Sequence, residues 1–181
     1  MDFIEGLPKS KGFSVILVVV DRLSKYAHFL ALSHPYSAMT VAQLFLDNIY
    51  KLHGLPSTIV SDRDKIFLSK FWQKLFKLLG TQLQLSTSYH PQIDCQSEVV
   101  NRCLQTYLRC MCSETPKEWS RWLPMAEWWY NTTFHSAIHS TPYEAVYGQP
   151  PPLHLPYLAG ESQVGAVDRS LQARKAGIKM L

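Results

Sequence analysis

Three acidic residues have the types and separations that metal-dependent chemistry on phosphates needs. Asp2 lies in the short alternating segment 1–5, Asp62 ends the segment 57–62, and Glu98 follows with 35 residues between it and Asp62. Clustered carboxylates repel one another, so one of them takes up a proton unless a cation lies between them. Mg²⁺ removes that cost, because it prefers oxygen ligands and leaves room for substrate phosphates in its shell. Two such ions ~3.5–4 Å apart can activate an attacking oxygen and stabilise a leaving oxygen in phosphoryl transfer.

Each acid also has a purely structural interpretation. Asp2 can be an unanchored terminal residue, and Asp62 can form a turn before Arg63. Glu98 can form an ion pair with Arg102, four positions later in a helix. Spacing alone leaves both interpretations open, and the choice depends on whether the elements that carry the acids converge.

The spacing of apolar residues predicts an α/β fold. Alternating or β-branched segments predict strands, and apolar residues at every third or fourth position predict helices. The predicted strands are 1–5, 14–23, 25–32, 57–62 and 82–85, and the predicted helices are 38–52, 68–79, 96–111, 118–133 and 141–147. Four prolines between residues 149 and 156 then favour extended backbone. We therefore expect one compact domain over residues 1–148, followed by a proline-rich linker and tail over residues 149–181.

These elements can bring the three acids together. A helix precedes the strand that ends in Asp62, so a right-handed crossover can place that strand parallel to the first strand, which carries Asp2. Neighbouring strands lie ~5 Å apart, close enough for two carboxylates to share a cation. Glu98 lies in the first turn of an amphipathic helix, on its polar face.

The composition excludes several other classes of protein. With 46% hydrophobic residues the chain is not disordered, and its net charge, 18 − 14 = +4, suits a polyanionic partner without requiring one. No apolar run approaches the ~20 residues of a membrane span, and the first residues do not resemble a secretory leader. The four cysteines lack the spacing of a zinc site, and His28, His53 and His90 lack partners at ligand spacing, so we expect no zinc role for them. We also expect the tryptophans of the helix 118–133 to lie in the core.

Three ordered segments resemble the integrase core of Ty3/gypsy-type LTR retrotransposons. They are MDFIEGLPKSKGFSVILVVVDRLSKYAHF, HGLPSTIVSDRDKIF and STSYHPQIDCQSEVVNRCLQTYLR, and a fourth segment, WLPMAEWWYNTTFHSAIHSTPYEAVYG, extends the resemblance to about residue 148. The resemblance implies an RNase H-like fold with a five-stranded mixed sheet flanked by helices. It also implies that Asp2, Asp62 and Glu98 form the D,D-35-E triad that holds two Mg²⁺ or Mn²⁺ ions.

The resemblance further implies an activity and its partners. The enzyme is expected to remove a terminal dinucleotide from element DNA and to join the new 3′-hydroxyl to target DNA, as a homo-oligomer in the nucleus without a small-molecule cofactor. The segment 89–96 corresponds to the family's active-site loop, where Tyr89 and Gln92, with Asn101 on the following helix, are candidates for contact with a DNA end. Arg102, Arg109 and Lys65 are candidates for phosphate contacts, although Arg102 and Arg109 also fit the solvated face of a helix.

The chain departs from the family pattern in ways that keep two alternatives open. Ile93 and Cys95 replace a threonine and a glycine, and Lys65 replaces a proline. If the glycine position needs a positive φ, Cys95 strains the loop by roughly 1–2 kcal/mol. The family's flanking zinc and DNA-binding domains are not in the sequence, so we expect a fragment of a Pol polyprotein. The alternatives are a catalytically impaired nucleic-acid-binding remnant and a ribonuclease H, which shares the fold and the two-metal chemistry.

Overall fold

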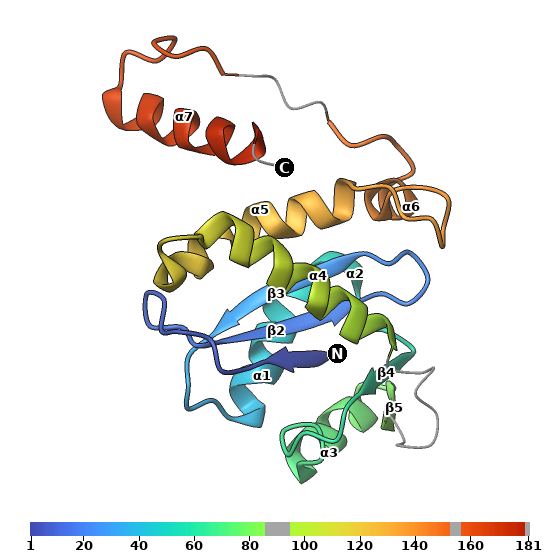
Figure 1. The fold of residues 1–181 in the computed structure, drawn as a ribbon. Coiled ribbons are helices and arrows are strands. Elements are labelled where there is room, and N and C mark those ends of the chain that lie inside the picture. The colour runs from blue at the N-terminus through green and yellow to red at the C-terminus, as the bar shows by residue number, and fades with distance from the viewer. Residues whose placement is uncertain (86–94, 153–156, 180–181) are drawn as a thin grey trace. The chain divides into compact units, whose positions relative to one another are not determined.

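The computed structural model describes residues 1–85, 95–152 and 157–179 (Figure 1). The chain divides into two compact units, residues 1–149 and residues 150–181. The first unit contains all three acids of the predicted triad. The second unit contains α7 (Gly165–Lys179), and Asp168 in the first turn of that helix accepts hydrogen bonds from the Tyr157 hydroxyl and the Gly160 amide, each 2.8 Å long. Of the helices within the described ranges, none is long and apolar enough to cross a membrane.

The first three strands form an antiparallel meander. β1 (Asp2–Ile4) pairs with β2 (Val15–Val20), and β2 pairs with β3 (Ala27–Leu32). The run VILVVV predicts a strand buried on both faces, and residues 15–18 are indeed buried. Each of the five predicted strands occurs at its expected place: the strand 82–85 has the expected bounds, and the other four are shorter than predicted.

The remaining two strands form a separate parallel pair. β4 (Thr58–Ser61) runs beside β5 (Gln82–Leu85), with Thr58 opposite Gln82 and Ser61 opposite Leu85. α3 (Lys70–Leu78) makes the crossover between them, and it begins at Ser69, whose side chain accepts a hydrogen bond from the Trp72 amide. This is the short β–α–β connection that parallel strands require.

The predicted single five-stranded sheet is instead present as a three-stranded and a two-stranded ladder. All three residues of β1 pair with β2, and among the described residues no ladder joins β1 to β4. The contact observed at this junction is a hydrogen bond of 2.7 Å from the Met1 ammonium to the Val60 carbonyl oxygen. The two ladders therefore meet where the expected sheet would be continuous.

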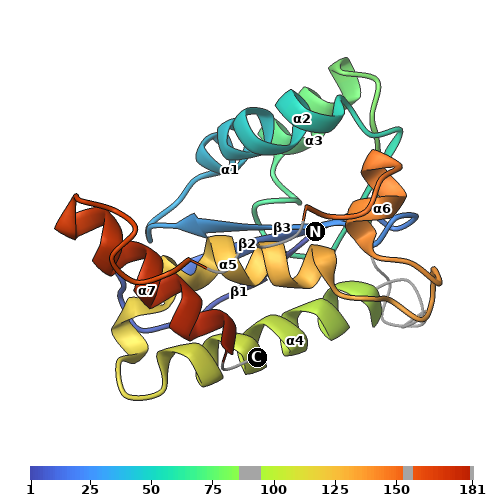
Figure 2. The ribbon, with the colours of Figure 1, turned by 90° about the horizontal axis from the view of Figure 1, so that it is seen from above.

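Helices cover both faces of the meander, and the alternation of β2 separates two hydrophobic cores (Figure 2). Val15 and Leu17 face α1 (Ala38–Phe45) and α3, together with the strand residue Ile59 of β4. Ile16 and Val18 face α4 (Cys95–Cys112) and α5 (Trp119–Thr132). Successive side chains of a strand point to opposite faces, so one strand supplies both cores.

The predicted helix over 38–52 consists of three parts. α1 continues into a π-helical turn, η1 (Leu46–Tyr50), and then into α2 (Lys51–His53), which ends at Gly54 with φ 75°. A single 3.6-residue period cannot describe a π-helical turn, which is why the sequence pattern predicts one continuous helix. The result places His53 at the end of α2, with its ring against that of His28 on β3.

The segment after α4 completes the core that contains Ile16 and Val18. A short 3₁₀ turn, η3 (Pro116–Glu118), links α4 to α5, and α6 (Pro142–Tyr147) carries a capping box formed by Thr141 and Glu144. Trp119 is fully buried and Trp122 and Trp129 pack against the core, whereas Trp128 is 44% exposed. The core assignment of the tryptophans is confirmed except at Trp128.

Candidate active site

The register of β1 directs Asp2 toward α4. Asp2 is opposite Val18 in the antiparallel ladder, and directly opposite residues project from the same face of a sheet. Val18 packs in the α4–α5 core, so Asp2 shares that side. Its Oδ1 accepts a hydrogen bond of 2.8 Å from the Phe3 amide, and its Oδ2 accepts one of 2.5 Å from Nδ2 of Asn101 on α4. Asp2 is therefore an anchored residue that joins the first strand to the helix of Glu98.

Asp62 lies directly after β4, next to the contact between the two ladders. Its Oδ1 accepts a hydrogen bond of 3.2 Å from the Asp64 amide, and Asp64 in turn accepts one of 2.7 Å from the Ile66 amide. These bonds fix the turn that follows the strand. The Met1–Val60 hydrogen bond joins the residue before Asp2 to the residue two positions before Asp62. The strand ends that carry the two aspartates thus meet.

Glu98 occupies the first turn of α4 and is turned toward solvent. Its side chain is 68% exposed and forms a 2.8 Å ion pair with Arg102, which is 76% exposed. This is the i,i+4 pair of the structural interpretation. Asn101, which bonds Asp2, lies three positions after Glu98, or about one helical turn. Asn101 thus links α4 to Asp2, while the carboxylate of Glu98 is held by Arg102.

The donor chemistry of the three acids fits a divalent ion, but they are not gathered around one position. Within residues 1–85, 95–152 and 157–179, no three His, Cys, Asp or Glu side chains form a metal-binding group. All three donors are carboxylate oxygens, the ligands that Mg²⁺ prefers. An exposed ion pair contributes about 0.3–0.5 kcal/mol, so Glu98 can exchange Arg102 for a cation at little cost.

Tyr36 lies near enough to Asp64 and Asp62 for their charges to act on its hydroxyl. Tyr36 stacks against Phe3 with ring centroids 5.3 Å apart, and its hydroxyl donates a 2.6 Å hydrogen bond to Glu5. Burial raises the pKa of Tyr36 well above its usual range, and the bond to Glu5 and the charges of Asp64 and Asp62 raise it further. Burial is the largest of these causes.

The predicted DNA contacts have different outcomes. Asn101 is engaged with Asp2, which the sequence did not indicate, because only the fold brings the two together. Arg102 is paired with Glu98, and Arg109 and Lys65 are exposed. Tyr89 and Gln92 lie outside the described residues, as does Ile93. Cys95 is the first residue of α4, where the backbone is helical.

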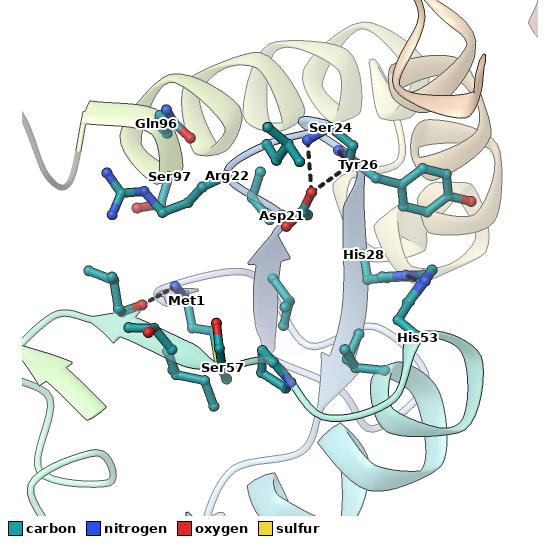
Figure 3. Close-up of a pocket in the computed structure, with 18 of the residues that line it drawn as sticks. Met1, Asp21, Arg22, Ser24, Tyr26, His28, His53, Ser57, Gln96 and Ser97 are labelled. Atoms are coloured by element: carbon teal, nitrogen blue, oxygen red, sulfur yellow. Dashed lines mark hydrogen bonds between the residues drawn. The ribbon is translucent and has the colours of Figure 1, made fainter. Parts of the chain in front are cut away.

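A cavity of about 560 Å³ lies beside the junction of the ladders (Figure 3). Met1 and Val60 line one side, Gln96 and Ser97 of α4 line another, and the polar side chains of Asp21, Arg22, Ser24, His28 and His53 complete the lining. His28 and His53 are 25 positions apart in the sequence, yet their rings meet at the cavity wall. The sequence offers no spacing signal for this pair, because it depends on the approach of α2 to β3.

Comparisons with known proteins show which family the chain resembles. The model of the integrase core domain family matches residues 1–91. The Tf2-3 and Tf2-4 transposon polyproteins of Schizosaccharomyces pombe are each 36% identical over 159 residues, which is 86% of this chain and 12% of the polyprotein. The chain thus spans about an eighth of the length of these curated relatives.

Solved structures of retroviral integrases share the fold. The HTLV-2 integrase catalytic core domain, determined in complex with magnesium, has a TM-score of 0.62 and 17% identity, covering 80% of this chain and 93% of that one. A simian T-cell lymphotropic virus intasome chain has a TM-score of 0.67 and 20% identity, covering 88% of this chain and 59% of that one. These likenesses establish an RNase H-like α/β fold. Because the family model covers half of the 181 residues and the resemblance seen in the sequence is confirmed, the chain belongs to the integrase core domain family.

Proposed function

We propose that this chain is the catalytic core of a retrotransposon integrase that cuts and joins DNA with Asp2, Asp62 and Glu98. The observation that carries the proposal is the hydrogen bond between Asp2 and Asn101, which ties the first strand to the helix turn that carries Glu98. The Met1–Val60 bond brings the strand end that precedes Asp62 to the same junction. Three elements far apart in the sequence therefore meet, and this supports the proposal.

The three carboxylates would hold two Mg²⁺ or Mn²⁺ ions, which supply charge neutralisation and activation of an attacking oxygen when bound. The HTLV-2 core was determined in complex with magnesium, which supports this cofactor. In the first reaction a water oxygen attacks phosphorus near the element end and a dinucleotide leaves. In the second, the exposed 3′-hydroxyl attacks a target phosphodiester, so that one P–O bond forms as another breaks.

Other residues of the chain have supporting parts. Asn101 orients Asp2, because its Nδ2 holds one carboxylate oxygen and leaves the second facing the Phe3 amide. Arg102 becomes available to a DNA phosphate once Glu98 turns inward, and the exposed side chains of Arg109 and Lys65 can add phosphate contacts. Tyr89 and Gln92 remain candidates for a DNA end.

The larger assembly is part of the same proposal. Residues 1–148 would be the catalytic core and residues 149–181 a linker and tail, within a Pol polyprotein that acts in the nucleus. DNA and further copies of the chain would be its partners, and the simian virus intasome, in which a related fold is assembled, supports this.

The test is a joining assay on a branched DNA substrate, run with Mg²⁺ and with Mn²⁺. Glu98→Gln keeps the size of the side chain and removes its charge, and we expect it to abolish joining. Glu118→Gln is a matched control, because Glu118 also forms an exposed ion pair, with Arg121 at 3.7 Å. Equal activity of wild type and Glu98→Gln would refute the catalytic role of Glu98.

A catalytically impaired remnant is the second candidate, and the Glu98–Arg102 pair is the observation that favours it. Wild-type protein that is folded and binds DNA, yet joins no substrate with either ion, would establish the remnant. Cleavage of an RNA–DNA hybrid without DNA joining would identify a ribonuclease H instead.

A further inference from the structure

The rings of His28 on β3 and His53 on α2 face each other through their Nε2 atoms, which are 2.9 Å apart. Two neutral rings in this position share one proton, so that one Nε2 donates and the other accepts. A lone pair of one imidazole therefore points at the other ring. The ring centroids are 5.1 Å apart, so the two rings lie nearly end to end, each Nε2 pointing at the other, at the wall of the cavity (Figure 3).

Glu127 on α5 lies against the other ring nitrogen of His28. Its Oε1 lies 3.1 Å from His28 Nδ1, and its Oε2 accepts a 2.8 Å hydrogen bond from the Phe29 amide. A carboxylate beside Nδ1 favours the tautomer in which Nδ1 carries the hydrogen, which leaves Nε2 as the basic nitrogen. Carboxylate–histidine pairs of this kind are the usual support of a metal-bound imidazole.

The two histidines differ in burial and in access to the cavity. His28 is 7% exposed and is held by Glu127, whereas His53 is exposed and lines the cavity. The ring of Tyr26 lies against both imidazoles, with centroid distances of 5.2 and 5.8 Å. The carboxylate of Asp21 lines the same cavity, so negative charge from Asp21 and Glu127 acts on the pair.

We propose that His28 and His53 form a binding site for a divalent transition-metal ion, separate from the carboxylate site of the proposed DNA chemistry. Zn²⁺ binds imidazole nitrogen at 2.0–2.1 Å in tetrahedral geometry, which separates two ligand nitrogens by roughly 3.3 Å. An ion bound to both nitrogens needs the observed 2.9 Å to open by a few tenths of an ångström and each ring to turn by roughly 35° from the line that joins the nitrogens. Water or a phosphate oxygen that enters the cavity would complete the shell.

The nature of the donors separates this site from the first one. Imidazole nitrogen selects Zn²⁺, Co²⁺ or Ni²⁺ over Mg²⁺, whereas the acids of the candidate active site select Mg²⁺. The two sites can therefore be loaded and measured independently. The inference does not depend on DNA joining by this chain.

The experiment is a titration of the full chain with Co²⁺, followed by its visible absorption bands. We expect bands typical of nitrogen ligation in the wild type and binding weaker by about tenfold or more in His53→Gln, because one of two protein ligands is lost. His53→Gln replaces an exposed side chain and keeps the fold, which circular dichroism verifies. His139→Asn is the matched control, since His139 is exposed and its φ of 50° is tolerated by asparagine.

Two further variants make the result specific. Glu127→Gln keeps an acceptor for the Phe29 amide but removes the charge behind His28, so we expect about tenfold weaker binding. His53→Cys supplies a thiolate in place of the ring, and we expect binding to persist with a new sulfur-to-cobalt charge-transfer band. Glu98→Gln is expected to leave the titration unchanged. Binding that is equal in wild type and His53→Gln, or no wild-type bands at millimolar Co²⁺, would overturn the proposal.

Discussion

Asn101 on α4 donates a 2.5 Å hydrogen bond from its Nδ2 to Oδ2 of Asp2 on β1, across 99 positions of sequence. Asn101 is a half-buried residue, and its Oδ1 is buried without a hydrogen-bond partner among the described residues. The amide therefore has one strong attachment, and that attachment is the carboxylate of the predicted triad. This relationship makes Asn101 a positioning residue for Asp2.

Asn101→Ala is expected to raise the Mg²⁺ concentration that gives half-maximal joining by about 10–100-fold, because a residue that supports a metal ligand typically contributes that much to metal affinity. The measurement is the Mg²⁺ concentration that gives half-maximal joining. Gln105→Ala, one turn further along α4, is the control and should leave that concentration unchanged. A uniform loss of activity at saturating Mg²⁺, with no change in the half-maximal concentration, would argue against positioning.

Arg102→Ala is expected to lower the half-maximal Mg²⁺ concentration by about twofold, since it releases Glu98 from a pair that contributes about 0.3–0.5 kcal/mol. The same substitution should raise the KM for DNA if Arg102 contacts phosphate. The two effects are separable, because only the second diminishes as salt increases. Arg121→Ala, which breaks the exposed pair with Glu118, should change neither quantity.

Asn131 is 1% exposed and closes α5 onto β3 through two hydrogen bonds of 2.8 Å, one with the Ala27 amide and one with its carbonyl oxygen. Asn131→Ala leaves both backbone groups unsatisfied and buried, so we expect the free energy of unfolding to fall by about 2–4 kcal/mol. Urea denaturation measures the change. Asn48→Ala removes a half-buried amide that bonds one carbonyl, that of Leu44, and should cost about 1 kcal/mol or less. Similar losses in the two variants would contradict the role given to Asn131.

Stability is expected to decrease as the pH falls below neutrality. Burial lowers the pKa of His53 below its usual 6.5, and the facing ring of His28 lowers it further, against the opposing charges of Asp21 and Glu127. Burial and the charge of Lys25 lower the pKa of His135 in the same direction. Because both rings are favoured as neutral groups in the fold, their contribution is complete above 6.5 and is lost as the pH falls through the lowered values.

The measurement is urea denaturation between pH 8 and pH 5. His53→Gln and His135→Gln should each flatten the dependence of stability on pH, because each removes one titrating ring. His139→Asn, at an exposed position, should leave the slope as it is in the wild type. A wild-type stability that rises toward pH 5 would reverse the sign expected for both rings.

The sequence predicts the elements well because their signals are local. The β-branched run of β2 and the amphipathic patterns of α3, α4 and α5 each depend on neighbouring residues, and all occur within a few positions of the expected limits. The π-helical turn after α1 escapes prediction, since it interrupts the period on which the prediction depends. The division of the sheet is likewise not predicted, because pairing between strands far apart in the sequence leaves no local signal.

The site is less predictable than the elements because its contacts are long-range. The carboxylates of Asp2, Asp62 and Glu98 are evident from type and spacing, and their elements converge. The choice of Arg102 as the partner of Glu98, and the meeting of His28 with His53, depend on side-chain positions that no local pattern encodes. Whether the three acids act together stays a prediction for the joining assay.

The pairing of Asp2 with Val18 has a consequence for how mutations act on this molecule. A slip of β1 by one residue along β2 would turn Asp2 toward the opposite layer and put the ring of Phe3 where the carboxylate had been. The aliphatic side chains 15–18, which are buried and cannot touch DNA, hold the ladder against that slip. If a substitution at residues 15–18 of β2 lowers activity, the expected cause is therefore that the Asp2 carboxylate points to the wrong face of the sheet, and not that a contact with the substrate is lost.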